Sequence, residues 1–109
     1  MFIARHIALD LIRSLLQPIG QIARHDRALA QQLRNAGSSV HLNLAEGNHR
    51  VGRDRMHFFR IAAGSAAEVR AVLEVAIAWQ YIDEESAAET LRHVDRELGL
   101  LWGLTHRRR

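Results

Sequence analysis

Apolar residues recur every three or four positions through nearly the whole chain, and a single proline and seven glycines interrupt them. In the third of four such segments, the spacing alternates between four and three residues along Phe58, Ala62, Ser65, Val69, Val72, Ala76 and Trp79. This spacing places the residues on one face of an α-helix. A β-sandwich or barrel would need many more turn residues. The sequence therefore predicts an all-α fold.

Breaks in the apolar spacing divide the chain into four helices. We expect Pro18 and Gly20 to end the first helix, Gly47 to end the second, and Asp54 to cap the third. The expected helices cover residues 2–17, 22–46, 54–81 and 84–105, followed by a basic tail at 106–109. Short connections predict an antiparallel up-down-up-down four-helix bundle, as a single domain over 1–109. An isolated antiparallel hairpin is the alternative, but it would leave many apolar residues uncovered.

The sequence lacks the motifs that are typical of several classes of enzymes and metal-binding proteins. The chain has no cysteine, no G-x-S-x-G motif, no paired-carboxylate motif and no phosphate-binding glycine loop. No two of its seven histidines are three or four residues apart, so no helix offers a ready metal site. We therefore expect no catalytic residues, no cofactor and no metal. The start of the chain lacks the features of a signal peptide, and no apolar run is long enough for a membrane helix. These features predict a cytoplasmic protein without a membrane partner.

The charge is distributed unevenly along the chain. All 15 basic residues, histidines aside, are arginines, and the net charge is +3. Residues 22–60 hold seven arginines and three acidic residues, whereas residues 83–106 hold two arginines and six acidic residues. Such segregation favours binding of nucleic acid or of another subunit. A bias of the coding sequence towards arginine is the alternative explanation for the missing lysines.

The candidate nucleic-acid-binding residues lie in the loop before the third helix and in the tail. They are Arg50, Arg53, Arg55, Arg107, Arg108 and Arg109. Arginine makes bidentate contacts with phosphate, so we expect salt-dependent contacts with the backbone of RNA or DNA. A solvated charged loop with no ligand is the alternative.

Two further groups of residues suggest contacts between helices or subunits. We predict a polar cluster of Asn43, Glu46, Ser65 and Glu68 between the second and third helices, which fixes their register. A ligand or RNA contact site is the alternative for this cluster. The apolar residues Leu42, Leu44, Ile77 and Trp102 and part of the first helix do not fit the inner faces. They predict a subunit interface, and scattered exposure is the alternative.

Two motifs resemble those of a known family. Residues 32–47 read QLRNAGSSVHLNLAEG, and residues 58–69 read FFRIAAGSAAEV. They are similar to the patterns Q-L-R-R-A-A-x-S-I-P-S-N-I-A-E-G and F-x-x-x-A-R-G-S-L-x-E-L of the bacterial four helix bundle protein family, also called the 23S rRNA intervening-sequence protein family. His41 and Leu42 stand where that pattern has Pro and Ser, and Ala63 stands where it has Arg.

The resemblance implies an antiparallel four-helix bundle that forms a homopentamer. A related group serves as accessory proteins of diversity-generating retroelements, in which a basic pentameric barrel engages nucleic acid and a reverse transcriptase. From the residues and the resemblance together, we expect a non-enzymatic oligomeric scaffold that contacts RNA or DNA backbone. The alternative is an adaptor that assembles with itself and binds another protein, without nucleic acid.

Overall fold

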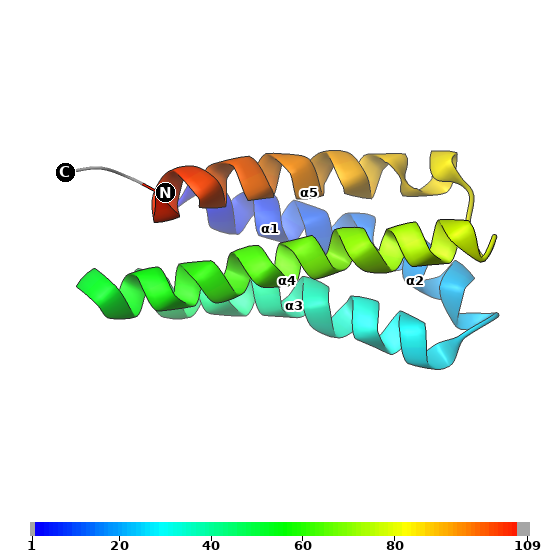
Figure 1. Cartoon of the computed structure of the whole chain (residues 1–109), viewed down its shortest axis with the longest axis horizontal. Helices are drawn as coiled ribbons and strands as arrows, with labels where there is room; N and C mark the ends of the chain where they lie inside the picture. The colour runs from blue at the N-terminus through cyan, green and yellow to red at the C-terminus, as the bar shows by residue number, and fades with distance from the viewer. Residues whose placement is uncertain (1, 107–109) are drawn as a thin grey trace.

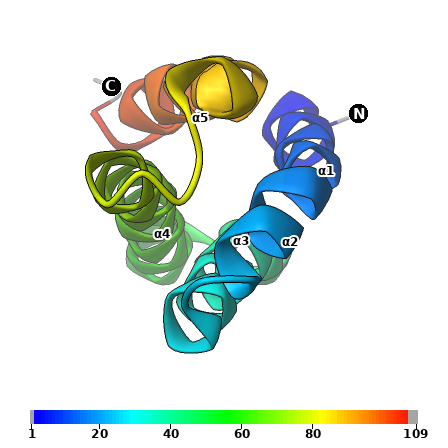
Figure 2. The ribbon, with the colours of Figure 1, turned by 90° about the vertical axis from the view of Figure 1, so that its right-hand side faces the viewer.

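The structure is a computed structural model that describes residues 2–106, and within that range it contains helices and no strand. The helices are α1 (Ile3–Ser14), α2 (Leu16–Ala23), α3 (Arg27–Asn48), α4 (Gly52–Ala78) and α5 (Glu84–Thr105). Helices α1 and α2 form one bent arm, so the whole is an antiparallel four-helix bundle of 45 × 22 × 21 Å (Figure 1). Viewed end-on, the arm, α3, α4 and α5 surround a common axis (Figure 2). The predicted fold class is confirmed.

The bend in the first arm lies before Pro18 and not at it. The prediction of a helix over 2–17 was wrong, because α1 ends at Ser14 and α2 runs through both Pro18 and Gly20. Pro18 is the third residue of α2, a position where a backbone N–H has no partner within its helix. Proline leaves the Ser14 carbonyl without the N–H donor four residues on. The hydroxyl of Thr90, which is fully buried, donates to that carbonyl at 3.0 Å.

The remaining helix ends follow local capping. Helix α3 begins at Arg27 and not at residue 22, because the Asp26 carboxylate accepts a hydrogen bond from the Leu29 N–H at 2.9 Å. Helix α5 covers the predicted 84–105. Its N-cap is Asp83, whose carboxylate accepts from the Ser86 N–H at 2.7 Å. Hydrogen bonds with the Ser86 side chain and backbone lower the pKa of Asp83.

Helix α4 differs from the prediction at both ends. It begins at Gly52, after Val51, so Asp54 lies in its first turn and is not its cap. It ends at Ala78, three residues earlier than predicted. Gln80 then adopts a left-handed φ of 65°, and the Tyr81 N–H bonds to the Ala76 carbonyl at 2.9 Å. This is the arrangement in which glycine is usual after a helix.

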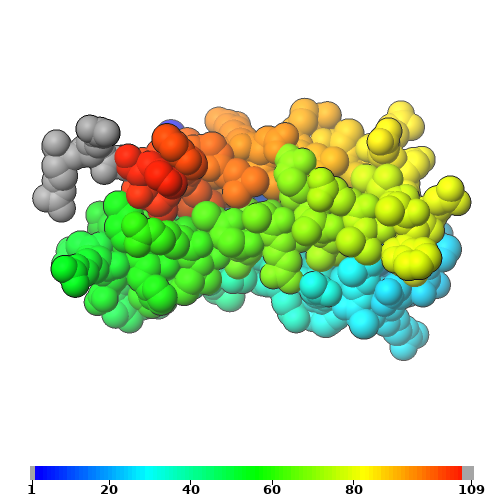
Figure 3. All heavy atoms as spheres, in the orientation of Figure 1, coloured from blue at the N-terminus to red at the C-terminus, as the bar shows by residue number. Residues whose placement is uncertain are grey.

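Gly47 does not end α3, contrary to the prediction, but lies inside its last turn. The residue is buried, and a Cβ there would come within 2.7 Å of Cε1 of Phe59. Glycine therefore permits the close approach of α3 and α4 at this end of the bundle. Figure 3 shows α4 exposed along the length of one face, between α5 and α3.

The core follows the predicted faces with local shifts. On α3, Leu33, Ala36 and Val40 are buried, but the next buried residue is Leu44 and not Asn43. On α4, Phe59 is buried in place of Phe58, and Trp79 is 67% exposed. Helix α5 departs furthest, because its inner face carries two polar residues. Its buried residues are Ala87, Thr90, Val94, Glu97 and Leu101.

Candidate functional site

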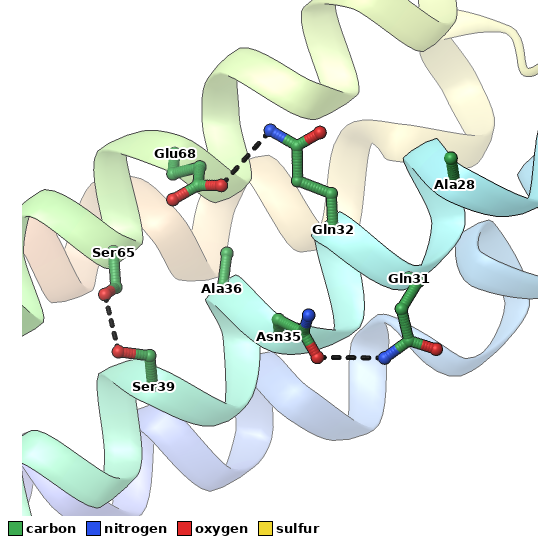
Figure 4. A pocket seen from close by; sticks show the side chains of 8 residues that line it. All are labelled: Ala28, Gln31, Gln32, Asn35, Ala36, Ser39, Ser65 and Glu68. Atoms are coloured by element: carbon green, nitrogen blue, oxygen red, sulfur yellow. Dashed lines mark hydrogen bonds between the residues drawn. The ribbon is translucent and has the colours of Figure 1, made fainter.

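A polar groove of about 530 Å³ lies between α3 and α4 (Figure 4). It is lined by Ala28, Gln31, Gln32, Asn35, Ala36, Ser39, Ser65 and Glu68. Two side-chain hydrogen bonds cross it from one helix to the other. Ser65 Oγ donates to Ser39 Oγ at 2.7 Å, and Gln32 Nε2 donates to Glu68 Oε2 at 3.2 Å. The groove thus joins residues of both family-like motifs.

The predicted polar cluster divides into three parts. Asn43 and Ser65 are joined through Ser39, because Asn43 Nδ2 donates to both the carbonyl and the hydroxyl of Ser39 at 2.9 Å. Glu68 is not part of this chain of bonds, because its carboxylate accepts a hydrogen bond from Gln32 instead. Glu46 is exposed and pairs with Arg50. The four residues therefore do not form one buried cluster. Ser39 is the member that the prediction missed, although its spacing of four residues from Asn43 was a usable signal.

The chemistry of the groove is that of neutral hydrogen bonding. Its lining consists of amides, hydroxyls, two alanines and one carboxylate, with no histidine or arginine among them. Ser39 and Ser65 bond to each other, and no lining residue is a base placed to activate a hydroxyl. The two cross-helix bonds join α3 to α4, and the predicted role of the cluster in fixing their register stays a prediction.

The arginines of the α3–α4 connection have different surroundings. Arg50 donates from Nε and Nη2 to Glu46 Oε2 at 3.0 and 2.7 Å, and its Nη1 lies 3.8 Å from Asp54 Oδ2. The Arg50 guanidinium also lies over the Phe58 ring, 5.2 Å from its centre. Two carboxylates thus offset the charge of this arginine.

Arg55 and Arg53 also differ from each other in their contacts. Arg55 Nε donates to the Gly47 carbonyl at 3.3 Å and Nη2 to the Asn48 carbonyl at 3.4 Å, so it caps the end of α3. Arg53 is exposed and makes no side-chain hydrogen bond or ion pair with any residue in 2–106. The start of α1 and the end of α5 lie at this same end of the bundle (Figure 1). The predicted Arg107, Arg108 and Arg109 lie outside the described residues.

A buried carboxyl group on α5 was not predicted from the sequence. Glu97 is 0% exposed, and neither of its carboxyl oxygens has a hydrogen-bond partner. Burial raises the pKa of Glu97 to about 8, and the nearby charge of Arg96 partly opposes this effect. The apolar spacing Ala87, Leu91, Val94, Leu98 and Leu101 would place Leu91 and Leu98 on the inner face of α5. Each lies one residue beyond a buried polar residue, Thr90 and Glu97 respectively.

An apolar stripe faces outward along the first arm. Ile12, Leu16 and Ile19 line a cavity of about 110 Å³ with Arg34 and Ser38 of α3. Leu16 is 76% exposed, and Leu42 on α3 is 64% exposed. Of the four residues predicted for an interface, Leu42 and Trp102 are exposed, Ile77 is half-buried, and Leu44 is fully buried in the core.

The described residues contain no group of three histidine, aspartate or glutamate side chains that could hold a metal ion. Among the helices of residues 2–106, none has both the length and the apolar character to cross a bilayer.

Comparison with known proteins connects this bundle to a family. One similar solved structure is that of a protein of unknown function from the S23 ribosomal protein family of Bacteroides thetaiotaomicron. The two share 19% identity with a TM-score of 0.86, over 94% of this chain and 98% of the other, which shows a common fold. None of the curated proteins compared with this chain is significantly similar to it. Residues 4–103 match the family described as 23S rRNA-intervening sequence protein. The chain therefore belongs to the 23S rRNA-intervening sequence protein family.

Proposed function

We propose that the protein is a non-enzymatic, homo-oligomeric scaffold that contacts the backbone of RNA or DNA at the end of the bundle formed by the α3–α4 connection. The observation that carries this proposal is the exposed Arg53, which has no partner in 2–106 and lies at the end of the bundle where α5 ends. The protein is proposed to act in the cytoplasm, which suits a chain without cysteine.

The contacts of the loop arginines rank their expected contributions. A guanidinium that already pairs with a carboxylate must lose that pair to bind phosphate. Arg50 pairs with Glu46, and Arg55 caps α3, whereas Arg53 has no such bond to lose. We expect Arg53 to contribute most among the three. We expect contacts to phosphates and not to base edges. The affinity should therefore depend little on the base sequence of the nucleic acid and should fall as the salt concentration rises.

Fluorescence anisotropy with labelled RNA and DNA at about 50 and 200 mM salt tests this proposal. Several phosphate contacts should lower the affinity by roughly 10³-fold over that range. Arg53→Ala should weaken binding more than Arg92→Ala, which removes the same charge from an exposed site on α5. Equal losses would point to net charge alone. No binding at the lower salt would refute the nucleic-acid contact and favour the adaptor.

Self-association is supported by the outward apolar stripe on the first arm. Leu16 is 76% exposed, and the half-buried Ile12 and Ile19 line the same cavity beside α3. Apolar side chains grouped at the surface in this way are usual at subunit interfaces. The family resemblance implies a pentamer. Light scattering after gel filtration should give a mass near five times 12.4 kDa.

Substitution of the stripe provides the matched test of assembly. Leu16→Glu places a charge on the stripe without disturbing the core, since the side chain is 76% exposed. It should lower the measured mass, whereas Glu74→Gln on the exposed side of α4 should not. A mass near 12.4 kDa for the unaltered protein would refute the proposal that it forms an oligomer.

The alternative proposal is a protein–protein adaptor without nucleic-acid binding. The same stripe favours it, because an apolar groove suits a helix of another protein as well as a second subunit. The anisotropy experiment separates the two functions.

A further inference from the structure

Glu97 is the one buried ionisable side chain in the described part of the bundle. Apart from it, the buried residues in 2–106 are apolar or glycine, with the exceptions of Thr90 and Pro18. Thr90 has a partner in the Ser14 carbonyl, whereas both oxygens of Glu97 lack one. An unpartnered carboxyl group in an apolar interior opposes folding, and it does so far more strongly when it is ionised.

The helix register places apolar side chains beside this group. Thr90 bonds to Ser14, and α1 and α5 are antiparallel, so Glu97, seven residues after Thr90, lies level with Ile7. Arg70 pairs with Asp95, so by the same argument Glu97 lies level with residue 68 on α4. The buried residues at and beside these levels are Ile7 and Ala8 on α1 and Ala66 and Val69 on α4. All four side chains are apolar, so none of them offers a hydrogen bond to the carboxyl group.

The charged groups around Glu97 lie at the surface. Helices α1, α2 and α4 pack against α5. Helix α2 has no ionisable residue, and those of α1 and α4 are exposed or half-buried. At this level Arg70 pairs with Asp95, and Asp10 pairs with Arg13. On α5 itself, Arg96 is exposed and His93 is half-buried beside Glu89. On α1, Arg5 is half-buried and its Nε has no hydrogen-bond partner, but neither Arg5 nor any other cation in 2–106 forms an ion pair with Glu97.

We propose that Glu97 is a pH-sensitive weak point of the bundle, whose carboxyl group is accommodated between α1, α4 and α5 when protonated and weakens the packing of α5 when it ionises. The inference is independent of the proposed nucleic-acid contact, because Glu97 lies in the core and makes no part of the arginine surface.

The sign of the pH dependence follows from the two states. The pKa of Glu97 is about 8 in the folded chain against 4.5 as the ordinary value. Between these values the unfolded chain loses the proton and the folded chain keeps it. Stability therefore falls as pH rises from about 4.5, and the folding equilibrium constant decreases by up to about tenfold per pH unit until the folded-state carboxyl ionises.

Denaturant unfolding between pH 5 and 8 tests the proposal. The informative quantity is the difference between the pH profiles of the unaltered protein and Glu97→Gln, because this difference isolates the contribution of the Glu97 carboxyl group. Glu97→Gln should remove a decrease of roughly tenfold per pH unit in the folding equilibrium constant. Glu74→Gln, at an exposed position on α4, should leave the decrease unchanged. Parallel pH profiles for the unaltered protein and Glu97→Gln would overturn the proposal.

Two further measurements keep the test decisive if Glu97→Gln folds poorly. Glu97→Leu replaces the carboxyl group with an apolar side chain and should remove the same pH-dependent decrease in the folding equilibrium constant. Carbon-13 NMR of the unaltered protein should show one glutamate carboxyl group still protonated at pH 6.5, and Glu97→Leu should remove that signal. If all glutamates of the folded protein ionise below pH 5.5, the proposal is wrong.

Discussion

The α3–α4 hairpin and the half of the bundle formed by α1 and α5 differ in where their polar side chains lie. Between α3 and α4, polar side chains lie at the edge of the interface, where Ser39 bonds to Ser65 and Gln32 bonds to Glu68. Between α1 and α5, polar side chains enter the core. Thr90 is satisfied there, and Glu97 is not. Polar groups at a partly exposed edge specify register at little cost, whereas a buried carboxyl group reduces stability.

The largest expected effect comes from removal of the unsatisfied group. Glu97→Leu should raise the free energy of unfolding at pH 8 by about 2–4 kcal/mol, because it removes the desolvation of a carboxyl group without a partner. Chemical denaturation monitored by circular dichroism measures this change. A loss of stability at pH 8 would mean that Glu97 makes a compensating contact in solution.

The close approach within the hairpin gives the next effect. Gly47→Ala should destabilise the fold by about 1–3 kcal/mol, since the added Cβ would lie 2.7 Å from the Phe59 ring. Gly64→Ala is the matched control on α4, because no atom lies within 4 Å of the new Cβ. It should stabilise the helix by about 0.5–1 kcal/mol. Opposite signs in thermal unfolding would confirm the tight contact, and equal signs would exclude it.

The satisfied polar group of the α1–α5 half gives a smaller effect. Thr90→Val removes the hydroxyl group at nearly constant volume and leaves the Ser14 carbonyl without its donor, so we expect a loss of about 1–2 kcal/mol. Pro18→Ala restores a backbone N–H four residues after Ser14. The loss caused by Thr90→Val should therefore be smaller in the Pro18→Ala background. Additive losses in this double-mutant cycle would show that the backbone N–H restored by Pro18→Ala does not replace the Thr90 hydroxyl as the donor to the Ser14 carbonyl.

The turn that joins the two halves gives the smallest effect. Gln80 has a φ of 65°, which glycine adopts without the strain that a side chain adds. Gln80→Gly should stabilise the protein by about 0.5–1 kcal/mol in thermal unfolding. A destabilised variant would show that the Gln80 side chain contributes more than its backbone conformation costs.

Much of the fold could be predicted because the apolar spacing is regular. It predicts the all-α class and, on α4, the buried residues Ala62, Val69, Val72 and Ala76 correctly. The helix ends were less accurate, since they depend on single hydrogen bonds. The Asp26 cap places the start of α3 at Arg27. The Thr90 hydroxyl donates to the Ser14 carbonyl, which has no backbone donor at Pro18.

The candidate sites could be predicted less well, because side-chain partners depend on three-dimensional neighbours. The sequence identified Asn43 and Ser65 but not the Ser39 that joins them. It grouped Arg50, Arg53 and Arg55, although these have different partners. Glu97 was missed because Leu98 beside it satisfies the heptad spacing equally well, and only packing decides which of the two residues turns inward.

Amide hydrogen exchange of the unaltered protein at pH 7 tests most directly whether the two halves differ in stability. The account predicts that amides around Glu97, in the stretch 94–101 of α5, exchange faster than those around Ser39 on α3, because local opening releases the buried carboxyl group. It also predicts that Glu97→Leu slows exchange in α5 more than in α3. Equal protection of both stretches, unchanged by that substitution, would contradict the account.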